Sequence, residues 1–265
     1  MNIIFAGNNM RALKCLEFLL KKKLNIILSI GHPKKKTDKY YFRSIEELSR
    51  RNNINFIKPK TLNTQKIYNK IKKLNADLMV LSGYSASILK HKIFSLPKYG
   101  TINLHGSLLP KYRGGSPLNW AIINGEKYTG ASIIQVDSGI DTGKILIQKK
   151  IKINNKDNIL SLTKKLNQIF PKLLFSVIKN ISTNKIKPKK QKKRLKYFKK
   201  RVPEDGLIYF KRYKAEKINN MVRALLPPFP GAFFIYNKKK IIITKMKIIK
   251  KNYNSNPGKI LFTSK

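Results

Sequence analysis

MNIIFAGNNMRALKCLEFLLKKKLNIILSIG (residues 1–31) alternates two short apolar runs with one amphipathic segment. Residues 2–7 predict a buried strand, residues 9–22 a helix with leucines on one face, and residues 24–31 a second strand. A strand, a helix and a strand joined by short connections are typical of a βαβ unit, in which the two strands run parallel. The segment therefore predicts an α/β fold with a Rossmann-like, mostly parallel sheet.

The same alternation continues along the chain. We expect further strands at residues 54–57, 76–82, 101–105, 130–136 and 144–153, and helices at residues 44–52, 64–74, 87–94, 117–123 and 158–179. A helix at residues 214–226 and strands at residues 232–236, 240–246 and 258–262 predict a small α+β unit near the C-terminus. Between these parts, 11 of the 17 residues from 185 to 201 are Lys or Arg, which favours a solvated linker or surface loop. We thus predict a main domain at residues 1–181, a basic linker at 182–201 and a C-terminal domain at 202–265.

The strong positive charge does not identify a function by itself. Among 265 residues, 58 are Lys or Arg and 12 are Asp or Glu, a formal net charge of +46. A balance of this kind is typical of proteins that bind nucleic acids. However, 49 of the 58 cations are Lys, which an AT-biased genome produces without selection for a partner, and Arg, the better phosphate ligand, is not enriched.

Several functional classes are disfavoured by what the sequence lacks. One cysteine (Cys15) and three histidines argue against a disulfide framework and against a metal centre, so we expect no metal. Residues 6–10 lack the second and third glycines of a dinucleotide-binding loop. There is no apolar run of about 20 residues and no signal-peptide pattern, so we expect a cytoplasmic protein without a membrane partner.

Two polar segments carry the candidate chemistry. In residues 103–115 (NLHGSLLPKYRGG), Asn103 and His105 lie two positions apart on a predicted strand, so both side chains face the same way. Such a pair needs either hydrogen-bond partners in the core or a function, and the strand alone leaves both open. Residues 137–143 (DSGIDTG) hold two of only twelve acids, although taken alone they also suit an ordinary Asp/Gly turn.

Together these segments closely resemble the formyltransferase family that uses 10-formyltetrahydrofolate. The resemblance rests on HGSLLP at residues 105–110, YRG at 112–114 and GIDTG at 139–143, and it extends over nearly the whole chain. It implies a catalytic Asn103, His105 and Asp141, and 10-formyltetrahydrofolate as formyl donor. The folate pocket would be lined by residues from two segments: Ser87, Ile88, Leu89, Asp137, Ser138, Gly139 and Ile140.

The chemistry explains why these residue types are needed. When a primary amine attacks the formyl carbon, the carbonyl oxygen gains negative charge, and each donor aimed at it contributes about 3–4 kcal/mol. We expect donors from the Asn103 amide and from a protonated His105, whose pKa Asp141 would raise. A water molecule or His105 itself could then accept the amine proton, and the leaving nitrogen N10 needs a proton in return. One departure is Gly115, where the family member acting on UDP-4-amino-4-deoxy-L-arabinose carries a cation.

Two branches of the family fit this core. The chain is most similar to the N-formyltransferases of nucleotide-linked amino sugars, such as UDP-4-amino-4-deoxy-L-arabinose, in residues 117–120, 201–206 and 220–233. This branch implies a sugar-nucleotide substrate and a role in surface polysaccharide biosynthesis. The alternative is methionyl-tRNA formyltransferase, which acts in translation initiation and would make tRNA a partner. That enzyme typically has a proline-rich insertion that residues 31–43 lack, and a larger C-terminal barrel than the 65 or so residues after Arg201 suggest.

Two other readings are disfavoured, and three questions stay open from the sequence. A glycinamide-ribonucleotide transformylase would leave the C-terminal unit unexplained, and intact Asn103, His105 and Asp141 speak against a basic RNA-binding protein without activity. Pairing of two chains into a homodimer is open, as is the identity of the sugar and of the nucleobase.

Overall fold

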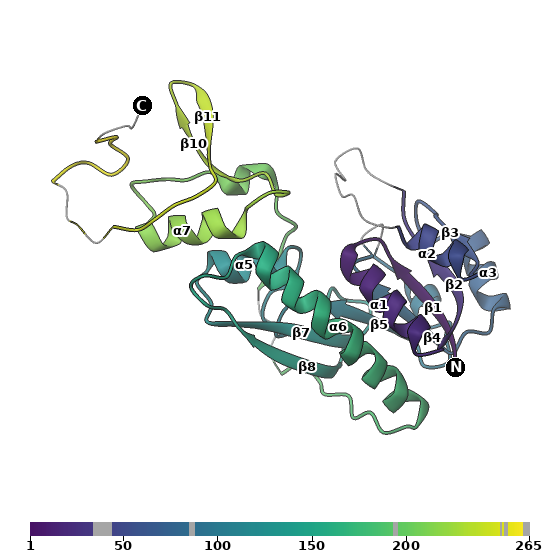
Figure 1. Cartoon of the computed structure of the whole chain (residues 1–265). Coiled ribbons are helices and arrows are strands. Elements are labelled where there is room, and N and C mark those ends of the chain that lie inside the picture. The colour runs from purple at the N-terminus through teal and green to yellow at the C-terminus, as the bar shows by residue number, and fades with distance from the viewer. Residues whose placement is uncertain (34–43, 85–87, 193–195, 250, 252–253, 262–265) are drawn as a thin grey trace.

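The computed structural model describes residues 1–33, 44–84, 88–192, 196–249, 251 and 254–261. These residues form a seven-stranded sheet with the order β3-β2-β1-β4-β5-β7-β8 (Figure 1). Its strands are β1 (Asn2–Gly7), β2 (Asn25–Ile30), β3 (Phe56–Ile57), β4 (Leu78–Ser82), β5 (Thr101–His105), β7 (Tyr128–Gln135) and β8 (Ile145–Lys152). The first five are parallel, whereas β7 is antiparallel to β5 and β8 to β7. The predicted Rossmann-like, mostly parallel sheet is therefore confirmed.

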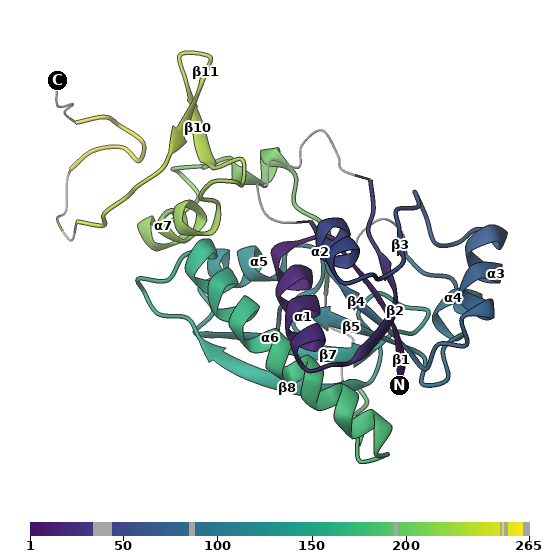
Figure 2. The same ribbon diagram turned by 45° about the vertical axis from the view of Figure 1, so that its right-hand side comes forward.

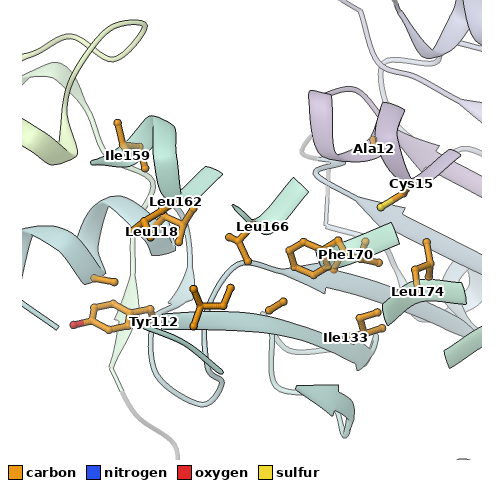
Figure 3. Close-up of a cluster of buried hydrophobic side chains, with 14 of the residues drawn as sticks. Ala12, Cys15, Tyr112, Leu118, Ile133, Ile159, Leu162, Leu166, Phe170 and Leu174 are labelled. Atoms are coloured by element: carbon orange, nitrogen blue, oxygen red, sulfur yellow. The ribbon is translucent and has the colours of Figure 1, made fainter. Parts of the chain in front are cut away.

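Helices cover both faces of the sheet. They are α1 (Met10–Lys21), α2 (Ile45–Arg51), α3 (Gln65–Lys73), α4 (His91–Phe94), α5 (Pro117–Ile123) and α6 (Ile159–Ser182). The larger core lies under α1 and α6, where Phe170 and Leu174 of α6 pack near Ile133 of β7 (Figure 3). A second core lies under α3 and α4 on the opposite face. Polar caps fix where the helices begin: Asn9, for example, accepts a hydrogen bond from the Ala12 N–H at 3.0 Å.

The C-terminal unit contains a short 3₁₀ helix (Pro203–Gly206), α7 (Ala215–Ala224) and a hairpin of β10 (Ala232–Tyr236) and β11 (Lys239–Ile243). Helix α7 lies beside α5, and the hairpin projects away from the large sheet (Figures 1 and 2). Asn119 of α5 donates a hydrogen bond to the Ala224 carbonyl at 2.8 Å. The hairpin turn has positive φ at Asn237 and Lys238, as a two-residue hairpin turn requires. The domain limits at residues 181 and 201 stay predictions.

The basic segment is more structured than predicted. Its lysines are exposed, as expected, but β9 (Tyr197–Phe198) pairs with β6 (Arg113–Gly114), and Lys189 exchanges two backbone hydrogen bonds of 2.8 Å with Ile145. The Phe198 ring lies 4.9 Å from the Tyr112 ring, measured between centroids. This aromatic contact anchors the lysine-rich segment to the loop that follows β5. The segment thus lies at the surface with short backbone pairings to the main domain, and its limits as a linker stay a prediction.

Two expected elements differ from the structure. The helix expected at residues 87–94 is reduced to the four residues of α4, which begin after the lysine at position 90. The strand expected at residues 258–262 is absent at 258–261, because these residues have no backbone hydrogen-bonding partner strand within the described part of the chain. Residue 262 lies outside the described residues, as do positions 34–43, part of the segment compared with the methionyl-tRNA enzymes.

Candidate active site

A cavity opens where the strand order of the sheet reverses, between β1 and β4. Ligands of α/β proteins bind at such a point, beyond the carboxyl ends of the strands. The cavity has a volume of about 550 Å³, within the usual range for small-molecule sites. Its wall combines residues of β5 with residues that follow β1, β4, β5 and β7. From β5 come Asn103 and His105, and from the segments after the strands come Asn9, Arg11, Gly83, Tyr84, Gly106, Asp137 and Asp141.

Asn103, His105 and Asp141 come together at this cavity. The Asn103 amide nitrogen donates to Asp141 Oδ1 at 3.1 Å, and His105 Nδ1 lies 3.3 Å from Asp141 Oδ2. The backbone N–H of Gly114 also donates to Asp141 Oδ2, at 2.9 Å. Asp141 thus joins the end of β5 to the loop that follows it, and one hydrogen of the Asn103 amide remains free for a ligand.

His105 has a hydrogen-bond acceptor near each ring nitrogen. Its Nε2 lies 2.8 Å from the Tyr112 carbonyl oxygen, which can only accept, so Nε2 carries a hydrogen. Nδ1 faces Asp141 at 3.3 Å, longer than a charge-assisted hydrogen bond, and the ring is only 6% exposed. The ring is therefore arranged to keep a second proton once one reaches Nδ1.

The electrostatic balance at His105 differs from the one expected. Burial is the largest effect and lowers the pKa of His105 below its ordinary value, while Asp141 and the Tyr112 carbonyl raise it and Arg11 lowers it further. The expected influence of Asp141 is present, but burial outweighs it, so the net shift of the His105 pKa is downward and not upward as expected. With Nε2 already bonded to Tyr112, neutral His105 suits the role of proton acceptor better than that of oxyanion donor.

The turn that carries Asp141 is held by a residue from the basic segment. Asp141 has a left-handed backbone, with φ of 54°, a conformation that few residues other than glycine adopt. The Gln191 side-chain nitrogen donates to the backbone carbonyls of Asp141, at 2.9 Å, and Gly143, at 2.8 Å. A Cβ atom at Gly143 would collide with the Gln135 carbonyl oxygen, so only glycine allows this close approach.

Most of the residues expected to line the folate pocket do line the cavity. These are Ile88, Leu89, Asp137, Gly139 and Ile140. Asp137 Oδ1 accepts hydrogen bonds from the Gly139 N–H at 3.1 Å and the Thr142 hydroxyl at 2.6 Å, which fixes this turn. Ser138 is exposed and is not part of the cavity wall, and Ser87 lies outside the described residues.

Three residues of the site were missed from the sequence, although two of them carried a signal. Gln191 interrupts a run of lysines, and Arg11 is one of only nine arginines. The third, Lys200, lines the cavity beside Gly115. A Cβ at Gly115 would collide with the Lys200 backbone, so a larger side chain has no room at this position.

Residues 1–178 match the formyl transferase family, and residues 200–265 match the C-terminal domain of formyl transferases. The chain belongs to the formyl transferase family. It is 42% identical over 262 residues to the bifunctional polymyxin resistance protein ArnA of Wigglesworthia glossinidia brevipalpis, covering 98% of this chain but only 39% of that protein. It is also 34% identical to the methionyl-tRNA formyltransferase of Caldanaerobacter subterraneus, over 98% of this chain and 85% of that enzyme.

A solved structure is similar over most of this formyltransferase. It is WlaRD, a sugar 3N-formyl transferase determined in the presence of dTDP and 5-N-formyl-THF. The two structures superpose with a TM-score of 0.70 at 25% sequence identity, covering 91% of this chain and 85% of WlaRD. The chain is thus an enzyme that transfers formyl groups, with 10-formyltetrahydrofolate as donor, as in its family. The apolar residues Leu81, Leu89 and Ile134 in the cavity wall suit the ring system of such a donor.

Within the described part of the chain, no three His, Cys, Asp or Glu side chains gather closely enough to hold a metal ion. Among the residues that the structure describes, no helix combines the length and the hydrophobicity needed to cross a bilayer.

We expect Gln191→Ala to lower kcat about tenfold, because the Asp141 turn loses the two hydrogen bonds that hold it in its left-handed conformation. Steady-state kinetics would measure this, with Lys192→Ala, the exposed neighbour, as matched control. A role through Asp141 further predicts that Gln191→Ala has little added effect when Asp141 is already Asn. Full additivity of the two substitutions would contradict that role.

Proposed function

We propose that this formyltransferase transfers the formyl group of 10-formyltetrahydrofolate to the primary amine of an amino sugar carried by a nucleotide. The observation that carries the proposal is the convergence of Asn103, His105 and Asp141 on the wall of an open cavity. The sugar branch is favoured by its resemblance to this chain at residues 117–120, 201–206 and 220–233. WlaRD, a sugar N-formyltransferase of the same fold, gives further support.

The donor would be held by the side of the cavity formed by residues 88–89 and 137–140. When bound, it supplies an electrophilic formyl carbon. Leu89 and Ile140 offer apolar contact, and the turn fixed by Asp137 offers backbone groups. In this proposal Ser87 and Ser138 retain the roles implied by the family resemblance.

The three polar side chains would divide the chemistry. The second amide hydrogen of Asn103 stabilises the negative charge on the formyl oxygen in the transition state. Neutral His105 takes the proton that the attacking amine must lose, and its Nδ1 is the nitrogen with a free lone pair. Asp141 then stabilises the imidazolium, while the Tyr112 carbonyl keeps the ring in place. The proton held by the His105–Asp141 pair is available to the leaving nitrogen.

Methionyl-tRNA remains the second candidate acceptor. The relative from Caldanaerobacter matches over 85% of its own length, and a net charge of +46 suits a polyanionic substrate.

The pairing of two chains into a homodimer also stays a prediction. The hairpin supports it, since Ile235, Tyr236 and Ile242 are each about half exposed on its surface.

The test is an acceptor panel. Purified protein receives 10-formyltetrahydrofolate together with, in separate reactions, dTDP-, UDP- and GDP-linked 3- or 4-amino sugars and methionyl-tRNA. We expect turnover with at least one sugar nucleotide, detected as the N-formyl product by mass spectrometry. Turnover on methionyl-tRNA alone would overturn the substrate assignment, and no turnover on any acceptor would overturn the proposed activity.

A further inference from the structure

Arg11 places a positive charge in the cavity wall, next to the three polar side chains. It lies in the first turn of α1, and its Nη1 donates to the Leu104 carbonyl oxygen at 3.3 Å. Its guanidinium carbon lies 4.6 Å from the centroid of the Phe170 ring. Its Nη2 lies 3.3 Å from the position that a Cβ atom on Gly106 would occupy. The hydrogen bond to Leu104 and the contact with the Phe170 ring hold the guanidinium against the end of β5.

This cation has no anionic partner in the protein. Within the residues that the structure describes, Arg11 forms no ion pair, and its Nε is buried without a hydrogen-bond acceptor. The two acids of the cavity are engaged elsewhere: Asp141 with Asn103 and Gly114, and Asp137 with its own turn. Burial of an unpaired charge is unfavourable, and guanidinium remains charged in proteins, so the site is incomplete until an anion binds.

The free part of the guanidinium is the part that recognises oxyanions. Because Nη1 is bonded to Leu104 and Nε is buried, Nη2 is the nitrogen that remains for a ligand, and its N–H groups can donate to an oxygen of a phosphate or a carboxylate. The N-terminus of the twelve-residue α1, capped by Asn9 in the same cavity wall, adds partial positive charge. Nη2 therefore fits an anionic group of a ligand.

The position of Arg11 within the cavity indicates which ligand supplies the anion. Arg11 Nη2 lies beside Gly106, at the start of the loop at residues 106–116, and the Lys200 backbone lies against Gly115 near the end of the same loop. Both residues thus flank this loop, whereas the proposed donor side is formed by residues 88–89 and 137–140. The loop side is left for the acceptor, and a nucleotide-linked sugar carries two phosphates.

We propose that Arg11 binds a phosphate of the acceptor nucleotide through its Nη2 nitrogen. The inference rests on the proposed function for the sugar nucleotide and adds a binding group for it. A fixed cation also disfavours the protonated form of a nearby amine, so Arg11 would help to keep the acceptor amine in its reactive neutral form.

The experiment compares wild type with Arg11→Gln, Arg11→Lys and a matched control, Lys21→Gln, which removes one exposed cation from the same helix. Isothermal titration calorimetry measures the Kd of UDP, dTDP, inorganic pyrophosphate and the folate analogue 5-formyltetrahydrofolate. We expect Arg11→Gln to weaken the nucleotide that binds wild type, and pyrophosphate, by at least about tenfold, as for loss of a charge-assisted pair. Arg11→Lys should give an intermediate loss, and the Kd of the folate should change less than about twofold in every variant.

The outcomes separate this inference from the proposed function. If no amino sugar is formylated but Arg11→Gln still weakens pyrophosphate binding, the phosphate site stands and the sugar assignment falls. Undiminished nucleotide and pyrophosphate binding in Arg11→Gln overturns the inference, as does an equal loss of folate binding, which would assign Arg11 to a carboxylate of the donor. Thermal unfolding without ligand provides the folding control: removal of an unpaired buried cation should leave Tm unchanged or raise it. If Arg11→Gln does not fold, unchanged binding by Arg11→Met, which keeps the side-chain length, overturns the inference in its place.

Discussion

His105→Ala is expected to lower kcat by at least about 100-fold, because the site loses the group that takes the amine proton and returns it to the leaving nitrogen. Steady-state formylation of the best acceptor measures this effect. The ring is buried and is bonded to the Tyr112 carbonyl, so the alanine variant also loses a contact that holds the loop. His105→Gln is therefore the matched variant: its amide can donate to Tyr112 but cannot accept the proton. Near-normal turnover in His105→Gln would remove His105 from the mechanism.

Asp141→Asn is expected to lower kcat by about 100- to 1,000-fold. Three groups converge on this carboxylate: the Asn103 amide and the Gly114 N–H as donors, and His105 Nδ1. An asparagine has one acceptor oxygen where the carboxylate has two, so one donor loses its partner and the imidazolium loses its counter-charge. Kinetics at saturating substrate would measure the loss. A less than tenfold decrease would show that the carboxylate charge is not needed.

The same substitution makes a prediction about pH. Asp141 raises the pKa of His105, so its neutralisation should lower that pKa below its value in the wild type, where burial already depresses it. His105 would then lose its proton at a lower pH, and the acidic limb of the kcat/KM profile should move to lower pH in Asp141→Asn. A shift to higher pH would contradict the assignment of that limb to His105.

Local patterns in the sequence were sufficient for most of the fold. The strand at Thr101–His105 and the helix at Pro117–Ile123 have the predicted limits, because alternating apolar residues and an N-terminal proline define them locally. The pairing of β6 with β9 was not predictable in this way. It joins two-residue segments more than eighty positions apart, one of them inside a lysine run. Long-range contacts of so few residues leave no periodic pattern.

The candidate site was predictable in its residue types but not in its electrostatics. The parity of Asn103 and His105 placed two polar side chains on one face of a strand, and the family resemblance added Asp141 and implied the three side chains that the structure brings together. The direction of the His105 pKa depends on how deeply the ring is buried and on a carbonyl seven residues away, which only the folded chain shows. Gln191 acts on Asp141 from fifty positions away, and its role has no local signature.

The central claim is that the site at Asn103, His105 and Asp141 formylates the amine of a nucleotide-linked sugar. Its most direct test is a competition, in which wild type and His105→Gln each receive 10-formyltetrahydrofolate with a mixture of nucleotide-linked amino sugars and methionyl-tRNA. Mass spectrometry then identifies which acceptor has gained a formyl group. We predict a formylated sugar nucleotide from the wild type and at most about one hundredth of that rate from the variant. Formyl-methionyl-tRNA as the sole product, or equal rates from the two proteins, would contradict the claim.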